Sequence, residues 1–370
     1  MIINFLVGSL ILRKNKTGVH LFHENLFNKF IEHNEFNIRL SVYEKAHNLN
    51  KRYNKKIPYA KYLRYSFKLA RLLSYFLPIE LLFGKSNIYI CDGMIPITIF
   101  KSLKIAVIHD LMVFRYPQNY SLIRKIYLKY YFWQSRYKAD YIIAVSETTK
   151  KDIIKYLGIP SEKIFIVYNG INISKDDINI KYVKGQVLDV KYFYSIGECR
   201  PNKNFLTAIK AFEKYKKQNP NQKIFFYLAG NHNSRYGKFL KKYVAEHKLN
   251  DYIKFIGYVT EEEKIALYKN ANIFIFISEY EGFGVPIIEA MHYGIPVITS
   301  NCSSMAEIAR RSAILVNPHD QEEIISAFYK LNDITSYNYY KQAGIKCCKS
   351  FSWENSYMQF RNKLKEIINE

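Results

Sequence analysis

The sequence lacks the patterns by which proteins usually bind divalent metals and nucleotide cofactors. It has no Asp-x-Asp pair and no His, Cys or Asp residues at metal-ligand spacing. It also has neither P-loop spacing nor the glycine fingerprint of dinucleotide-binding proteins, so an ATPase or a dehydrogenase is not indicated. The usual divalent ion that bridges carboxylates and a diphosphate is therefore not expected. We predict that the protein needs no metal and no cofactor.

Cysteines and long apolar runs are also scarce. The five cysteines are odd in number and scattered, which fits a reducing compartment. No apolar run approaches the roughly 20 residues of a membrane span. Residues 1–12 are apolar but lack a basic start and a small-residue cleavage site, so we expect a first core strand there and not a signal peptide. The resulting expectation is a cytoplasmic protein.

The chain is long, rich in hydrophobic residues and strongly basic. Its 370 residues favour two domains, and its hydrophobic content of 49% favours a packed core. The net charge is +23. Residues 1–184 carry 30 Lys and Arg against 13 Asp and Glu, or +17, and the remainder carries 25 against 19, or +6. The excess of positive charge therefore belongs to the first half.

The densest basic segment covers residues 51–71. Four cations in it recur at helical spacing between Leu and aromatic residues: Lys61, Arg64, Lys68 and Arg71. A basic amphipathic helix of this kind favours peripheral contact with an anionic membrane, and a solvated surface helix is the alternative. No nucleic-acid-binding motif is present, so we expect no nucleic acid partner.

Short β-rich runs alternate with helical runs along the chain, which predicts parallel sheets with crossover helices. The first half has predicted strands at 2–7, 88–90, 105–109, 141–146 and 164–168, and predicted helices at 20–33, 61–76, 122–137 and 147–157. The second half has predicted strands at 192–196, 224–229, 253–256, 273–277, 297–300 and 313–316. Its predicted helices are 204–215, 235–248, 261–269, 287–293, 304–310 and 321–331. Asp320 is the expected cap of the last helix.

The fold class that follows is α/β, with two doubly wound, Rossmann-like parallel-sheet domains that face each other across a cleft. The first domain is assigned to residues 1–172 and the second to residues 191–351. Residues 173–190 are polar, charged and poorly patterned, and are expected to form a linker. Ligands of such sheets lie outside the carboxyl ends of the strands.

The most informative stretch runs from Glu281 to Glu289. It places a glycine-bearing turn between a strand-like run, 273–277, and a helix-like run that begins near Ile287. A strand, a tight turn and a helix N-terminus make an anion site, because free backbone N–H groups and the helix dipole point at the ligand. A carboxylate beside such a site is suited to hold hydroxyl groups. An anion flanked by hydroxyls describes a nucleotide sugar.

A second candidate for anion binding is the loop from Ser195 to Asn204. It again connects a strand to a helix, and it contains a glycine together with Arg200 and Lys203. Backbone N–H groups and two cations suit a diphosphate, because Arg can bind two oxygens at once. An ordinary β–α connection is the alternative for this loop taken alone.

The first half contributes two further candidates. His109 lies at the carboxyl end of the predicted strand 105–109, where functional side chains emerge, and could donate to a sugar hydroxyl or stabilise charge. Gly18 precedes a predicted helix and could allow a backbone to approach phosphate closely. A structural histidine and an ordinary loop glycine are the alternatives.

These segments resemble a known family. The stretch Glu281–Met291, followed by Gly294-Ile-Pro-Val297, is similar to the E-x7-E signature of the retaining glycosyltransferases of family 4, which have the GT-B fold. Further similar segments cover nearly all of the chain: 139–140, 145–147, 167–171, 255–260, 267–271, 305–308, 313–318 and 351–354. His109-Asp-Leu111 followed by Tyr116-Pro117 resembles the bacterial subgroup that includes mannosyltransferases of O-antigen and capsule assembly.

The resemblance implies roles for the residues of the signature. Glu289 would bind the ribose hydroxyls of a nucleotide-sugar donor. Glu281 would contact the transferred sugar near its C3 and C4 hydroxyls and count among the catalytic residues. The backbone of Phe283, Gly284 and Val285 would meet the sugar and the diphosphate.

It also implies roles outside the signature. Lys203 and Arg200 would neutralise the diphosphate, and Gly18 would line it. His109 would be catalytic, on the C6-hydroxyl side of the sugar and beside the reacting carbon. Tyr258 falls where the family reads the nucleobase through main-chain groups. The last segment, 352–370, would return to pack on the first domain.

The chain departs from the family pattern at three places. Asn202 stands where members often have Arg before the loop lysine, and Glu198 stands where others have Arg after the loop glycine. Only Gly18 remains of the usual pair of glycines near the N-terminus. Arg200 could replace the missing arginine.

The expected function is the transfer of a hexosyl group with retention of configuration and without a metal. Mannose is the first expectation for the sugar, and GDP-mannose for the donor. The expected acceptor is a glycan or lipid-linked glycan at the inner face of the cytoplasmic membrane, in cell-surface polysaccharide synthesis. A sugar-nucleotide 2-epimerase and a catalytically silent glycan-binding or scaffold subunit are the alternatives. The sequence shows none of the additional His and carboxylate groups that a proton-shuffling epimerase site needs.

Overall fold

The computed structural model describes residues 1–6, 18–42, 60–62, 77–92, 95–172 and 180–369. The chain forms two compact units, and each is described by itself below. Unit 1 comprises Met1–Gly170 and Trp353–Glu370, and unit 2 comprises Ile171–Ser352.

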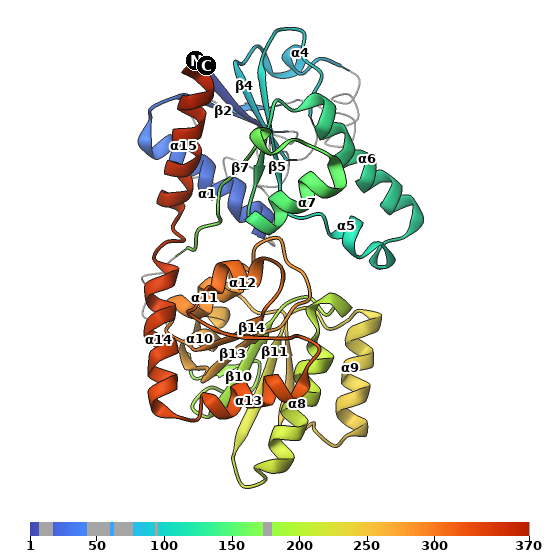
Figure 1. The fold of residues 1–370 in the computed structure, drawn as a ribbon, viewed down its shortest axis with the longest axis vertical. Helices are drawn as coiled ribbons and strands as arrows, with labels where there is room; N and C mark the ends of the chain where they lie inside the picture. The colour runs from blue at the N-terminus through green and yellow to red at the C-terminus, as the bar shows by residue number, and fades with distance from the viewer. Residues whose placement is uncertain (7–17, 43–59, 63–76, 93–94, 173–179, 370) are drawn as a thin grey trace. The chain divides into compact units, whose positions relative to one another are not determined.

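Unit 1 is built on a parallel sheet of seven strands in the order β3-β2-β1-β4-β5-β6-β7 (Figure 1). The strands are β1 (Ile2–Leu6), β2 (Asn37–Val42), β3 (Ala60–Tyr62), β4 (Ile88–Asp92), β5 (Leu103–Ile108), β6 (Tyr141–Ala144) and β7 (Ile164–Ile166). The central strands are buried on both faces, as expected for a parallel sheet covered by helices, so they contain continuous apolar runs. Ile3 is in register with Ile38 on one side and with Ile88 on the other.

The helices of unit 1 are α1 (Gly18–His33), α4 (Ile79–Phe83), α5 (Met112–Arg115), α6 (Leu122–Lys138), α7 (Glu147–Leu157) and α15 (Trp353–Asn369). α7 begins after Ser146, whose hydroxyl accepts from the backbone N–H of Thr149, and ends at Gly158 with a φ of 62°. These are the expected N-cap and C-terminal glycine of a helix. α15 packs against α1, where the ring of Phe30 lies 4.9 Å from that of Tyr357.

Unit 2 is built on a parallel sheet of six strands in the order β12-β11-β10-β13-β14-β15 (Figure 1). The strands are β10 (Lys191–Ile196), β11 (Ile224–Ala229), β12 (Ile253–Gly257), β13 (Ile273–Phe276), β14 (Val297–Ser300) and β15 (Ile314–Val316). Its helices are α8 (Phe205–Gln218), α9 (Arg235–Glu246), α10 (Glu261–Asn270), α11 (Val285–His292), α12 (Ser303–Ala309), α13 (Gln321–Lys330) and α14 (Ile334–Cys348). Asp320 caps α13 as predicted, because its carboxylate accepts from the N–H groups of Glu322 and Glu323.

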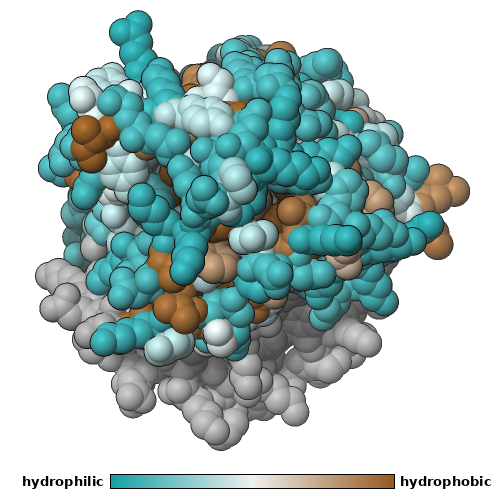
Figure 2. Space-filling model, turned by 90° about the horizontal axis from the view of Figure 1, so that it is seen from below, coloured by the Kyte–Doolittle hydropathy of each residue, from teal (hydrophilic) through white to brown (hydrophobic). Residues whose placement is uncertain are grey.

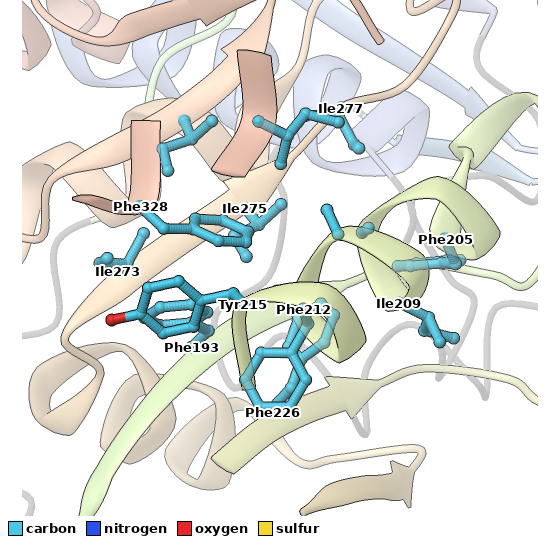
Figure 3. Close-up of a cluster of buried hydrophobic side chains, with 14 of the residues drawn as sticks. Phe193, Phe205, Ile209, Phe212, Tyr215, Phe226, Ile273, Ile275, Ile277 and Phe328 are labelled. Carbon is cyan, nitrogen blue, oxygen red and sulfur yellow. The ribbon is translucent and has the colours of Figure 1, made fainter. Parts of the chain in front are cut away.

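The core of unit 2 lies between one face of this sheet and the helices α8 and α13. Figure 3 shows Phe193 of β10 beneath Phe328 and Tyr215, with Phe212 and Phe226 next to them. The ring of Phe193 lies 4.8 Å from that of Phe328 and 5.7 Å from that of Phe212. Aromatic residues bury a large area each, so this cluster anchors the helices on the sheet and holds the ends of the strands in place.

The α/β prediction is confirmed, and most predicted elements are present within a few residues of their predicted ends. The helix predicted over 61–76 is wrong at its start, because residues 60–62 pair with β2 as the edge strand β3. Lys61 is therefore a strand residue. The other three cations of that prediction, Arg64, Lys68 and Arg71, lie outside the described residues, as does most of the predicted helix.

Several further elements were not predicted, among them β2, α14 and the short helices α4 and α5. β2 contains polar residues in its interior, and Arg39 is accommodated there because its guanidinium donates to the carbonyls of Phe83 and Lys85. α14 contains Gly344, an unfavourable helix residue. A Cβ at Gly344 would come 3.1 Å from Met291 Cγ, so the glycine allows α14 to pack closely on α11.

The segment expected to be a linker, 173–190, contains structure in its described part. Tyr182–Val183 (β8) and Gln186–Val187 (β9) form a short antiparallel hairpin. Val183 and Leu188 are buried, and the hydroxyl of Tyr227 donates to the carbonyl of Val187. This part of the segment therefore belongs to the packed body of unit 2.

Within the described ranges, no helix is long and apolar enough to cross a membrane. The face shown in Figure 2 is mostly hydrophilic, and its hydrophobic residues form small separate groups.

Candidate functional site

The topology brings the two predicted anion-binding loops of unit 2 together. β10 pairs with both β11 and β13, so the direction of strand order changes between β10 and β13. The loop from Gly197 to Asn204 follows β10, and the loop from Ile277 to Gly284 follows β13. Both loops leave the same edge of the sheet at this switch point, which is the usual place for a ligand in such a fold.

Lys203 and Glu281 meet at this position. Lys203 ends a short 3₁₀ turn, 201–203, and its Nζ lies 2.5 Å from Glu281 Oε1. Both side chains are mostly buried, with 19% and 15% of their surface exposed. Lys203 Nζ also lies 5.2 Å from the centre of the Phe276 ring. The structure thus places a paired cation and carboxylate, separated by 78 residues in the chain, at the centre of the sheet edge.

The loop that carries Glu281 is held by two serines of α12. The Ser303 hydroxyl donates to the carbonyl of Glu281, and the N–H of Glu281 donates back to the same hydroxyl. The buried Ser304 hydroxyl contacts the carbonyls of Glu281 and Phe283 at 2.9 and 2.8 Å. These contacts tie the loop that leads into α11 to the start of α12.

The turn into α11 has the geometry predicted for anion binding. Gly284 has a φ of 103°, which favours glycine, and α11 begins at Val285 with proline in its first turn. The first N–H groups of a helix have no partner within the helix and carry its positive dipole end. The backbone at Phe283, Gly284 and Val285 is therefore suited to meet a phosphate or a polarised hydroxyl.

Glu289 lies one turn further along α11 in a second polar cluster. Its carboxylate accepts from Lys264 Nζ at 2.8 Å and from the Tyr268 hydroxyl at 3.0 Å, both from α10. Lys264 also pairs with Glu261. Burial opposes the positive charge of Lys264, but Glu289 and Glu261 outweigh it and raise the lysine pKa above its ordinary value. Burial, together with Glu289, raises the pKa of Tyr268 well above its ordinary value, so its hydroxyl remains a donor.

The remaining loop residues have different partners. Arg200 pairs with Glu198 at 2.7 Å, and both side chains are about half exposed. The buried amide of Asn202 has no hydrogen-bond partner among the described residues. Tyr258 directly follows β12 at the same sheet edge and is largely exposed. Arg200 is thus held by an acidic neighbour and Asn202 offers a buried amide beside Lys203.

The predicted residues of unit 1 also lie at a switch point. α1 comes after β1 in the chain, Asp92 ends β4, and His109 follows β5. Because β1, β4 and β5 are parallel neighbours, these groups lie at the same edge of the sheet. His109 Nε2 is 3.5 Å from Nε2 of His23, and that same nitrogen of His23 is 3.6 Å from Asp92 Oδ1. Gly18 is the exposed first residue of α1, the helix that carries His23.

The environment keeps His109 uncharged. Burial, followed by the neighbouring His23, lowers the pKa of His109 to about 3. The Phe22 ring meets the His109 ring edge-on at 5.2 Å, and the Thr149 hydroxyl donates to the His109 carbonyl at 3.3 Å. A neutral imidazole can donate or accept a hydrogen bond but cannot stabilise an anion by its own charge.

His23, Asp92 and His109 are also the group that could hold a metal. Their ligand atoms all lie within 4.8 Å of one another. The separations of 3.5 and 3.6 Å are long for hydrogen bonds, and two imidazoles with one carboxylate are a known donor set for transition metals. The three residues are far apart in sequence, so spacing alone did not indicate this group.

Several residues of these clusters were not predicted. Lys264, Tyr268, His23, Ser303 and Ser304 each contact a predicted site residue or its loop, and Asp92 contacts His23. His20 and His23 are three residues apart and share a helix face, a pattern that could have pointed to the cluster at His109. Lys264 carries no comparable signal, because a lysine in a helix is ordinary.

Comparison with known proteins places this geometry in a family. Residues 32–175 match the family described as Glycosyltransferase Family 4, and residues 176–351 match Glycosyl transferases group 1. The chain is 31% identical to the O-antigen chain mannosyltransferase RfbU of Salmonella typhimurium over 263 aligned residues. The aligned region covers 70% of each protein. It is 28% identical over 269 residues to O-antigen chain mannosyltransferase B of Escherichia coli, again with 70% of each covered.

Solved structures show the same fold at low identity. A sucrose-phosphate synthase from Thermosynechococcus elongatus superposes with a TM-score of 0.73 at 16% identity, over 100% of this chain and 99% of that one. The Anabaena protein HepE, in complex with UDP and glucose, superposes with a TM-score of 0.70 at 14% identity, over 99% of this chain and 100% of HepE. These matches, together with the two parallel sheets and their switch-point loops, support one conclusion: the chain belongs to glycosyltransferase family 4 and is a glycosyl-transferring enzyme of the GT-B fold.

Proposed function

We propose that this enzyme transfers a hexosyl group from a nucleoside-diphosphate sugar with retention of anomeric configuration and without a metal. The observation that carries the proposal is the pair Lys203–Glu281 beside the N-terminus of α11. It combines a cation and the N-terminus of a helix, which suit a diphosphate, with a carboxylate, which suits the hydroxyls of the attached sugar.

The Lys203–Glu281 pair suggests how the donor is accepted. The diphosphate takes the place of Glu281 as the partner of Lys203, and the released carboxylate accepts hydrogen bonds from sugar hydroxyls. Glu289, oriented by Lys264 and Tyr268, accepts from the ribose hydroxyls. Arg200 supplies a second cation if it leaves Glu198.

The chemical step needs no protein base. The bond between the sugar C1 and the phosphate oxygen breaks, and the acceptor hydroxyl attacks C1 from the same face. The acceptor proton passes to the departing phosphate oxygen. Lys203 and the α11 N–H groups stabilise the charge on the leaving diphosphate. His109, neutral because of its lowered pKa, donates or accepts a hydrogen bond near the sugar.

Mannose is the proposed sugar and GDP-mannose the proposed donor. Two relatives are O-antigen chain mannosyltransferases, which supports this choice and a lipid-linked glycan as acceptor in cell-surface polysaccharide synthesis. UDP-glucose is the first competitor to test, because HepE of the same fold is described with UDP and glucose. Discrimination between such sugars depends on a few contacts worth about 1–3 kcal/mol each.

The proposal is tested with the purified full chain, GDP-, UDP-, ADP- and dTDP-sugars, and chelator in every reaction. We expect turnover of GDP-mannose, a product whose mass is increased by one hexose, and an α linkage from the α donor by NMR. Glu281→Gln should abolish turnover, whereas Glu322→Gln, an exposed carboxylate of α13, should not. An inverted linkage or the absence of turnover across the panel would contradict the proposal.

The same assays distinguish the transferase from the two alternatives, a sugar-nucleotide 2-epimerase and a catalytically silent subunit. An isomerised donor with no lengthened acceptor would identify an epimerase. Donor binding by calorimetry without hydrolysis or transfer would favour a glycan-binding or scaffold subunit. The intact Lys203–Glu281 and Lys264–Glu289 pairs favour the transferase.

A further inference from the structure

Helix α6 of unit 1 exposes a set of large apolar side chains. Ile123 is 83% exposed, Leu122 69% and Tyr137 64%. Four more large residues of the same helix are exposed: Ile126, Tyr127, Tyr130 and Trp133. Soluble helices normally turn such residues inward, so this face requires a partner.

The exposed residues form a stripe along one side of the helix, interrupted only by the buried Gln134. At 100° per residue, all seven fall within an arc of about 140° along a helix that is about 25 Å long. The opposite side packs inward, where the Phe132 ring lies 6.4 Å from that of Phe114 and the Tyr131 hydroxyl donates to the Asp92 carbonyl. α6 therefore has a packed face and a separate apolar face directed to solvent.

Positive charge borders this stripe on both sides. Residues 111–138 contain six Lys and Arg and no Asp or Glu. On the same helical projection, Arg124 and Lys138 lie at one border of the stripe and Lys125, Lys129 and Arg136 near the other. Within the described residues, none of these five forms an ion pair with a carboxylate, and Arg136 donates instead to the carbonyl of Leu157.

We propose that α6 lies in the plane of an anionic lipid bilayer, with its apolar stripe among the acyl chains and its flanking cations at the lipid phosphates. An apolar face of Ile, Leu, Tyr and Trp bordered by Lys and Arg is the pattern of an interfacial helix, and Tyr and Trp favour the headgroup level. An acidic protein partner would match the charge but not an apolar arc of this length. The inference rests on the proposed function only in that a lipid-linked acceptor is met at such a surface.

Vesicle binding tests the proposal without any substrate, so its failure is distinct from failure of the transferase proposal. The full chain is sedimented with phosphatidylglycerol vesicles and with phosphatidylcholine vesicles. We expect preferential binding to the anionic vesicles that weakens with added salt. Equal binding to both, or no binding to either, overturns the proposal.

Substitutions locate the contact. Ile123→Glu with Ile126→Glu should lower vesicle partitioning by about tenfold or more, because two anchors are lost and two repelling charges are added. Ile334→Glu is the matched control, since Ile334 is 68% exposed at the start of α14 in unit 2. Unchanged partitioning of the α6 variant overturns the proposal. If only charge reversal at Lys61, Arg64 and Lys68 removes binding, the contact lies in that segment and α6 is excluded.

Tryptophan fluorescence gives a second, independent measurement. The chain has two tryptophans: Trp133 on the stripe and the buried Trp353, whose Nε1 has no hydrogen-bond partner in the described part of the chain. In the Trp353→Phe variant, Trp133 alone should shift to shorter wavelength with anionic vesicles and be quenched by brominated lipid. Absence of both effects overturns the proposal. A dimer in solution that the Ile123→Glu, Ile126→Glu variant dissociates would overturn it in favour of a second copy of the chain.

Discussion

Lys203 and Glu281 are joined by an ion pair of 2.5 Å between loops that follow two neighbouring strands, β10 and β13. Neither residue has this partner in the unfolded chain, and both are mostly shielded from water in the fold. Under the proposed function, the pair keeps the donor site neutral until a diphosphate arrives.

The two residues should therefore be energetically coupled. Lys203→Met and Glu281→Gln should each lower the free energy of unfolding by about 1–3 kcal/mol, because each leaves a buried partner unsatisfied. The double variant should lose less than the sum of the two. Denaturant unfolding of the four proteins measures this. Strict additivity would show that the pair does not form.

Donor binding should depend on the polar cluster at Glu289. Glu289→Ala should weaken nucleoside-diphosphate binding by about 10- to 100-fold, because under the proposed function the ribose hydroxyls would lose an acceptor. Tyr268→Phe removes only one of the two contacts that orient the carboxylate and should have a smaller effect in the same direction. Calorimetry with GDP measures both, with Tyr329→Phe as an exposed tyrosine control. Equal affinity of Glu289→Ala and the unmodified protein would remove this residue from the site.

Gly230 should be indispensable for the loop that carries Lys203. Its φ is 124°, and a Cβ there would lie 1.9 Å from the carbonyl oxygen of Gly197. Gly230→Ala should destabilise unit 2 by more than about 3 kcal/mol and disturb the loop. Gly185→Ala is the control, because Gly185 also has positive φ but nothing within 4 Å of its Cβ. It should cost only about 1 kcal/mol. Similar melting temperatures for the two variants would contradict this account.

His109 should make the stability of the fold depend on pH. Its pKa is about 3 in the fold and about 6.5 in an unfolded chain, so between these values only the unfolded chain binds the proton. Stability is therefore retained above about pH 6.5 and is lost as the pH falls toward 3. His109→Gln should lose less stability than the unmodified protein between pH 7.5 and pH 5 in urea unfolding. Equal losses would show that His109 is not kept neutral by its surroundings.

Chelation should leave turnover unchanged. Lys203 and the α11 N–H groups are proposed to stabilise the leaving diphosphate, a task for which other sites use a divalent ion. Activity with and without EDTA measures this. If EDTA abolishes activity and added Zn²⁺ restores it, His23, Asp92 and His109 are the residues to examine. His23→Gln should then prevent the restoration, and His319→Gln, which is exposed in unit 2, should not.

Local patterns in the sequence were sufficient for the fold class and for the choice of many candidate site residues. The helix predicted at 147–157 matches α7 at both ends. Ser146 caps its first turn by accepting a hydrogen bond from the Thr149 N–H, and Gly158 ends it with a positive φ. The family was identified from the segment Glu281–Glu289, whose strand, turn and helix form within one short stretch. In contrast, residues 60–62 were predicted as the start of a helix and form β3, because pairing with β2 outweighs local propensity.

The sequence by itself determined the alternation of strands and helices, the two loops predicted to bind anions and the identity of their charged residues. These features arise from interactions between residues a few positions apart. Only the tertiary structure decided that Lys203 faces Glu281, that Lys264 and Tyr268 orient Glu289, that His23 and Asp92 gather at His109, and that α6 directs an apolar stripe to solvent. The order of strands in each sheet sets these contacts, and that order depends on packing between segments distant in the chain.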